Sequence, residues 1–191
     1  FLGLGGIDAE EEAALSEISE AEAARAIAAV LGETSLETAR RLVSEEGAEA
    51  EETNDNLFAA VQKMNVMEKI KLARMGGKEA RSLLVKDRNK VVALSALQSP
   101  KITEIEVVAM AQSKAISDEI LRVIANNKDW TRSYPVKLAL STNPKTPLPQ
   151  AVKFLNYLQD RDLRSLMKSK DVSTAISTHA RRILDKKGRA Q

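Results

Sequence analysis

The tetrapeptides "KDRN" (Lys86–Asn89), "KDWT" (Lys128–Thr131) and "KDVS" (Lys170–Ser173) occur in one chain, each beginning 42 residues after the one before. A lysine in the last turn of a helix is stabilised by the partial negative charge of the exposed carbonyls. The fourth residue of each copy (Asn, Thr or Ser) can accept hydrogen bonds from the unpaired amides that open the next helix, and the aspartate can assist it. The tetrapeptide therefore predicts a junction between helices that recurs at a fixed interval; the alternative is a row of Lys-Asp pairs that contacts a ligand.

The residues around the tetrapeptide repeat as well. Leu121, Arg122 and Ile124 superpose on Leu163, Arg164 and Leu166 at an offset of 42, and Arg81 precedes the first copy after a slip of one residue. The stretch "VALSALQSPK" ending at Lys101 matches "VKLALSTNPK" ending at Lys145, at an offset of 44. Apolar residues recur at spacings of three and four, and no run alternates as a strand does. We predict an all-α protein with a repeating unit of 42 to 44 residues that contains about three short helices.

From residue 65 to residue 184, this pattern resembles the armadillo and HEAT repeat class. The connectors "SPKIT" (Ser99–Thr103) and "NPKTP" (Asn143–Pro147), each after a Leu/Ala-rich helix, are also similar to the leucine-rich-repeat-variant proteins of bacteria. The resemblance implies a right-handed α-solenoid, in which stacked helical units share one continuous core. It implies no particular activity.

The charge divides the chain into two predicted domains. Residues 1–60 carry 15 acidic and 3 basic side chains, whereas residues 61–191 carry 12 acidic and 26 basic ones. We therefore predict an acidic arm, with helices over 8–31 and 34–47 and a flexible linker from 48 to 56, joined to a basic helical body. A partly disordered arm is the alternative. The arm would act as a tether or as an intramolecular competitor for partners of the body.

The residues needed for catalysis are scarce. The chain has no cysteine and one histidine, His179, so we predict neither a metal site nor a thiol nucleophile. The stretch "GGKE" (Gly76–Glu79) lacks the first glycine and the hydroxyl residue of a phosphate-binding loop. Asp129 beside Trp130 resembles the pairing that the helical-repeat alkylpurine glycosylases place on a basic concave face, but one such junction does not predict their chemistry. We expect no enzymatic activity and no cofactor.

Basic and aromatic side chains suggest a binding face instead. Arg81, Arg122 and Arg164 occupy matching positions and would form a ladder if equivalent residues of successive units aligned on one surface. The predicted face consists of Arg81, Arg122, Lys128, Trp130, Arg132, Tyr134, Arg164 and Lys170. For the aromatic residues, packing in the core is the alternative. For the basic ones, it is an ordinary solvated surface.

The sequence thus predicts a non-enzymatic scaffold or adaptor that binds another protein, for which an acidic partner would suit the basic body. The alternative is nucleic-acid binding through the basic face. No segment reaches the roughly 18 to 20 uncharged apolar residues of a membrane span. The lack of cysteine is compatible with a reducing compartment, and we expect a cytoplasmic location.

Overall fold

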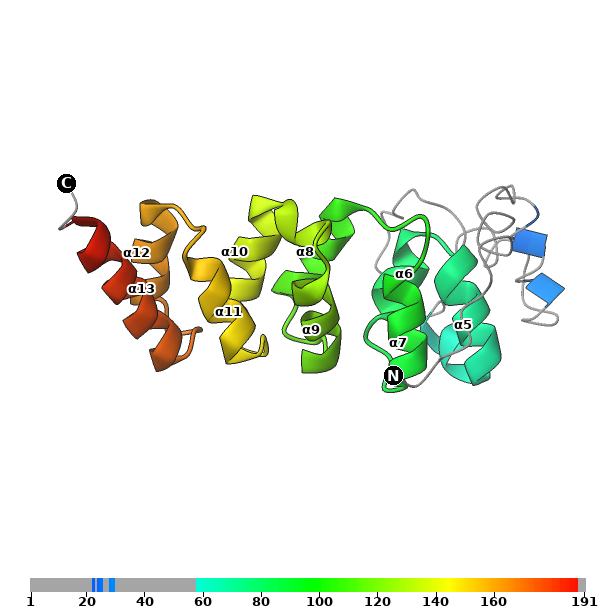
Figure 1. Cartoon of the computed structure of the whole chain (residues 1–191). Coiled ribbons are helices and arrows are strands. Elements are labelled where there is room, and N and C mark those ends of the chain that lie inside the picture. Colours follow the sequence, from blue (N-terminus) through cyan, green and yellow to red (C-terminus); the bar gives the residue numbers. More distant parts are fainter. Residues whose placement is uncertain (1–21, 23, 26–27, 30–57, 189–191) are drawn as a thin grey trace. The chain divides into compact units, whose positions relative to one another are not determined.

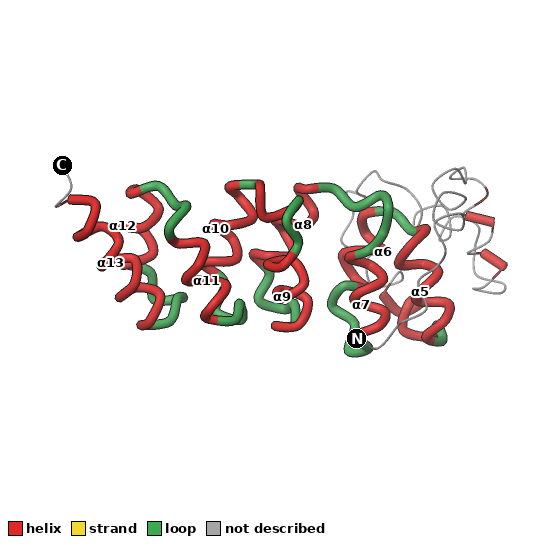
Figure 2. The backbone as a smooth tube through the Cα atoms, in the orientation of Figure 1, coloured by secondary structure: helices red, strands yellow, loops and turns green. Residues whose placement is uncertain are grey.

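The computed structural model describes residues 22, 24–25, 28–29 and 58–188. Within the predicted arm, the described residues at 22–29 are helical, while the predicted helix over 34–47 and the linker over 48–56 lie outside the described residues. Residues 58–63 are also helical, so a helix crosses the predicted boundary at 60. No strand occurs over the described ranges, in agreement with the all-α prediction (Figure 2).

The chain divides into two compact units, Phe1–Ile102 and Thr103–Gln191. The first contains α5 (Val66–Met75), α6 (Lys78–Leu84) and α7 (Lys90–Leu97). The second contains α8 (Glu104–Gln112), α9 (Asp118–Asn126), the 3₁₀ helix η1 (Trp130–Arg132), α10 (Tyr134–Thr142), α11 (Leu148–Leu155), α12 (Asp160–Lys168) and α13 (Thr174–Gly188). None of these helices is long and apolar enough to cross a membrane.

The helix starts follow the capping residues that the sequence contains. Asn65 and Glu68 form a reciprocal capping box at the start of α5, and Thr103 and Glu106 form another at α8. The Ser117 side chain accepts a hydrogen bond from the N–H of Ile120 at the start of α9. These three predicted starts are confirmed, since each side chain satisfies an amide that the helix itself leaves unpaired.

The tetrapeptides lie at helix junctions, but only two of them cap a helix as predicted. Asn89 caps α7 by accepting from the N–H of Val91 (2.9 Å), and Ser173 accepts from the N–H of Ile176 in α13 (3.4 Å). The prediction was wrong for Thr131, which lies inside η1 and donates its hydroxyl to the carbonyl of Asn127 (2.7 Å). Here the Asn127 side chain accepts from the following amides and starts a 3₁₀ turn instead.

The first unit is held together by α5, which packs against both α6 and α7. Gly76 ends α5 where α6 comes close: a Cβ on this residue would lie 2.8 Å from the Cβ of Ala80 and 2.5 Å from the carbonyl of Leu72. Lys69 of α5 forms a 2.8 Å ion pair with Asp87, whose other oxygen accepts from the N–H of Asn89. The junction before α7 is thereby fixed to α5.

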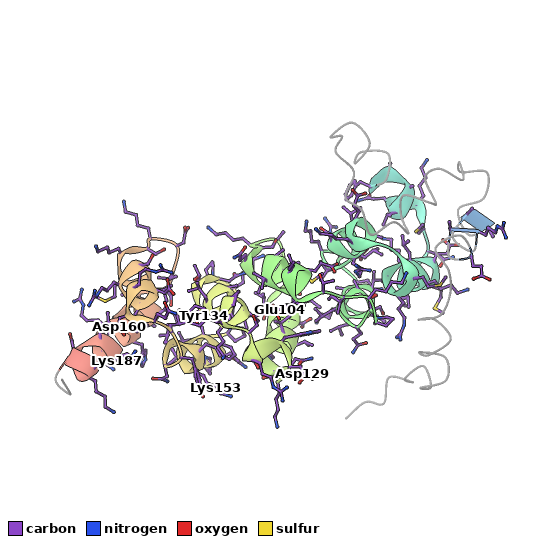
Figure 3. All side chains as sticks on the ribbon, turned by 90° about the horizontal axis from the view of Figure 1, so that it is seen from above. Glu104, Asp129, Tyr134, Lys153, Asp160 and Lys187 are labelled. Carbon is purple, nitrogen blue, oxygen red and sulfur yellow. The ribbon has the colours of Figure 1, made fainter. Side chains whose placement is uncertain are left out.

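In the second unit, the helices alternate between two layers. Figure 1 shows them as consecutive pairs, α8 with α9, α10 with α11 and α12 with α13. Figure 3 shows Glu104, Tyr134 and Asp160, the first residues of α8, α10 and α12, on one side. On the other side it shows Asp129, shortly after α9, Lys153 of α11 and Lys187 of α13. We call α8, α10 and α12 the first layer and α9, α11 and α13 the second layer. A buried apolar cluster that includes Leu155, Leu163 and Ile176 joins α11, α12 and α13.

The pairing explains what the 42-residue interval means. Three α-helices lie between successive tetrapeptides, whereas first-layer helices begin at Glu104, Tyr134 and Asp160, at intervals of 30 and 26 residues. Three is an odd number, so a shift of three helices moves a residue of the second unit from one layer to the other. Matching positions in successive 42-residue units therefore do not share a face.

Candidate interaction groove

Hydrogen bonds align the three helices of the first layer in parallel. The Ser133 hydroxyl donates to Glu104 (2.6 Å), which joins the starts of α10 and α8. At the other end, the Asn143 amide donates to the carbonyls of Ala111 (2.7 Å) and Ser113 (3.1 Å), which joins the ends of the same two helices. Like ends therefore lie side by side.

Tyr134 connects the start of α10 to the start of α12, so these two helices are also parallel. Its hydroxyl donates to Asp162 through a short hydrogen bond and accepts from the N–H of Gln159 (3.0 Å), directly before α12. Burial, followed by the hydrogen bond to Asp162, raises the pKa of the Tyr134 hydroxyl. The hydroxyl thus stays protonated near neutral pH and can act as the donor that joins the two helices.

A groove of about 380 Å³ runs across the three parallel helices. Its lining residues belong to α8, α10 and α12 and to the loop that follows each of these helices. The lining residues are Gln112, Lys114, Leu138, Ala139, Thr142, Asn143, Pro144, Asp162, Ser165, Leu166, Ser169 and Asp171. We call this surface the first-layer groove.

An ion pair bridges the first-layer groove. Lys114, after α8, approaches Asp171, after α12, to 2.8 Å, although 57 residues separate them in sequence. Both side chains remain largely exposed, at 63% and 67%. The hydrogen bond and charge of Lys114 lower the pKa of the Asp171 carboxyl. Packed helices lie about 8–10 Å apart, so this contact requires the loops after α8 and α12 to bend toward each other across the end of α10.

The residues of the predicted binding face do not form one surface. Arg81 is wholly buried, and its guanidinium donates to the carbonyl of Gly76 (2.8 Å), so its prediction as a surface residue was wrong. Arg122 lies on α9 in the second layer and Arg164 on α12 in the first. The predicted ladder of Arg81, Arg122 and Arg164 therefore does not form.

The remaining predicted residues surround η1 or lie in loops. Lys128 and Lys170 are exposed, and Trp130 is half-buried in η1. Exposed Arg132 pairs with Asp129 (3.7 Å), and exposed Arg122 pairs with Asp118 (3.9 Å). Tyr134 is the one member that contributes to the groove region, through its bond to Asp162. In the aromatic group, Phe154 is buried in the core, whereas Tyr157 is exposed beneath the ammonium of Lys137, 5.2 Å from its ring centre.

Sequence reasoning missed the groove residues Lys114, Asn143 and Asp162, and it singled out Asp171 only as the aspartate of the third tetrapeptide. A signal for the helix ends alone was present, because each first-layer helix is followed by Ser113, Asn143 or Ser169, whose side chain accepts from the amide two residues on. Such turns mark where a helix ends but not its layer, because Asn127 makes the same turn after α9. Among the described residues, no three His, Asp or Glu side chains are grouped so that they could hold a metal ion.

Comparisons with known proteins add no assignment: no family model matches the chain, and neither a curated protein nor a solved structure gives a significant match.

Proposed function

We propose that this protein is a non-enzymatic interaction module whose first-layer groove binds an extended segment of another protein. The observation that carries the proposal is that three parallel helices present their C-terminal ends to one groove. Gln112 and Ser165 there can donate to and accept from a peptide backbone, and the Thr142 hydroxyl, which donates to the carbonyl of Leu138, can accept from it. Leu138 and Pro144 supply apolar contact beside them.

The same arrangement supports an α-solenoid of the HEAT and armadillo type as the architecture. In that class, stacked helix pairs form an extended surface on which a partner lies. The paired helices of the second unit and their shared groove agree with such an arrangement. We therefore regard the module as a scaffold or adaptor.

Nucleic-acid binding through the basic body is the second candidate. The net positive charge of residues 61–191 favours it. The groove itself does not, because Asp162 and Asp171 lie in it and its lysine, Lys114, is paired with Asp171. Exposed Arg122 and Arg132 each also have a carboxylate within 4 Å. A phosphate backbone would meet these negative charges.

The test is a selection of peptides from a random library displayed against the full chain. Enriched peptides are then measured in solution by fluorescence anisotropy against a blocking variant, Thr142→Arg, which places a long side chain in the groove. The matched control is Thr178→Arg, also an exposed helical threonine but on α13. We expect Thr142→Arg to abolish binding and Thr178→Arg to leave it unchanged.

Two results would count against the proposal. If no enriched peptide distinguishes Thr142→Arg from the parent chain, the groove is not the binding surface. If a labelled DNA or RNA duplex binds tightly at low salt, loses affinity steeply as salt rises and is unaffected by Thr142→Arg, the second candidate takes its place.

A further inference from the structure

The C-terminal end of the first-layer groove contains two kinds of group that can bind a cation. The C-terminal ends of α8, α10 and α12 all meet there, and the last carbonyls of each helix carry partial negative charge. A carboxylate, Asp171 in the loop after α12, also lines the groove at this end, whereas Asp162 lies in the first turn of α12, at the opposite end. A cation that enters this end meets the helix ends and the Asp171 carboxylate together.

A cation of the chain itself already occupies part of this site. The Lys114 ammonium lies 2.8 Å from Asp171. An alkyl-ammonium group therefore fits against this carboxylate with good hydrogen-bond geometry. Because both partners are largely exposed, water screens their attraction and the pair is weak, so an incoming cation can replace Lys114 at low cost.

We propose that this end of the groove recognises a lysine or arginine side chain of the bound segment, which takes the place of Lys114 on Asp171. The inference rests on the proposed function, since it names the chemistry of the segment that the groove binds. Lys114 then acts as an internal competitor for Asp171. The recognised segment is basic at this position, although the body of the chain is itself basic.

The proposal makes two substitutions act in opposite directions. Asp171→Asn removes the carboxylate that binds the partner's cation, so we expect peptides with a basic residue to bind about two- to fivefold more weakly. Lys114→Ala removes the competitor, so the same peptides should bind more tightly by a similar factor. If Lys114 were instead a direct contact to the partner, its loss would weaken binding.

The measurement uses the full chain and the peptides from the library selection, together with a matched peptide in which the basic residue is replaced by glutamine. The control is Asp129→Asn, which breaks an even more exposed Asp–Arg pair outside the groove and should leave affinity unchanged. A second selection, on the charge-swapped double variant Lys114→Asp/Asp171→Lys, should enrich an acidic residue at the same peptide position. Circular dichroism of each variant verifies that the helices are intact.

The outcomes separate this inference from the proposed function. Peptides that Thr142→Arg excludes, but that carry no preferred basic residue or that bind Lys114→Ala more weakly, would leave the proposed function standing and overturn the inference. If no peptide depends on the groove at all, both fail. Opposite effects of Asp171→Asn and Lys114→Ala on a basic peptide would establish the exchange.

Discussion

At the scale of single residues, Thr146 has a buried hydroxyl at a position where equivalent connectors have an apolar side chain. In the five-residue connectors after α8 and α12, the fourth residue is Ile116 or Val172, and the equivalent residue after α10 is Thr146. Thr146 is 7% exposed, and its hydroxyl has no hydrogen-bond partner within the described part of the chain. A buried hydroxyl without a partner loses its bonds to water and gains none in return.

Thr146→Val should therefore stabilise the protein. The two side chains have nearly the same shape, so the substitution removes the unpaired hydroxyl without creating a cavity. We expect the free energy of unfolding in a urea titration to rise by about 1 kcal/mol. Thr178→Val, at an exposed position on α13, is the control and should change little. A loss of stability in Thr146→Val would show that the hydroxyl is bonded in solution.

Asp87 makes a pH-dependent contribution to the first unit. Burial alone would raise the pKa of this carboxyl, but hydrogen bonds from Lys69 and from the N–H of Asn89, together with the charge of Lys69, hold it below its usual value. A carboxyl whose pKa is lower in the folded state stabilises the fold above its unfolded pKa of about 4, and this contribution is lost as the pH falls through the folded value.

Asp87→Asn should lower the free energy of unfolding at pH 7 by up to about 1 kcal/mol, the range for a single ion pair near the surface. The difference between variant and parent should shrink as the pH is lowered below 4 and vanish once Asp87 is protonated. Urea titrations from pH 7 to pH 2.5 would measure it. A difference that stays constant with pH would mean that the carboxylate charge is not the cause.

At the scale of the helices, Asn143 is the main polar connection between α8 and α10. Its amide donates to two carbonyls at the end of α8, and its oxygen accepts from the N–H of Lys145. The side chain is 5% exposed, so these groups have no ready access to water. One residue thus closes the turn after α10 and fixes that helix to its neighbour.

Asn143→Ala should destabilise the protein by about 2 kcal/mol, because it leaves carbonyls of Ala111 and Ser113 without this donor. Asn156→Ala, at an exposed residue after α11, is the matched control and should cost a few tenths of that. Thermal unfolding followed by circular dichroism would separate the two. Equal effects would show that Asn143 acts only through its local turn.

The helices could be predicted from sequence more completely than their layers could. Capping residues act over three or four positions, so Asn65, Thr103 and Ser117 identified their helices from local sequence alone. Which helices share a layer depends on contacts such as Asn143 with Ala111, 32 residues apart, and no local pattern encodes them. Arg81 shows the same limit: its charge suggested a surface position, but the carbonyl of Gly76 gives it a partner in the interior.

At the scale of the whole molecule, the division between Ile102 and Thr103 defines a fragment to test. Residues 103–191 retain the Thr103–Glu106 capping box, all three first-layer helices and the groove. We expect this fragment to fold alone, with a helical circular dichroism spectrum and a cooperative urea transition.

A shorter fragment, residues 117–191, is the comparison. It begins at the Ser117 cap but lacks α8 and therefore the partners of Ser133 and Asn143. It should be clearly less stable than 103–191. If 103–191 fails to unfold cooperatively, the second unit depends on the rest of the chain for its stability.

The parallel stacking of α8, α10 and α12 also fixes how many residues of an extended ligand lie over each helix. With neighbouring helices about 8–10 Å apart and an extended chain advancing about 3.3–3.6 Å per residue, one helix corresponds to about three ligand residues. A segment that crosses from α8 to α12 is thus read over about five or six residues. Duplication of one helix pair would lengthen the bound segment by about three residues. Duplication of a single helix would instead move every later helix to the other layer and interrupt the groove.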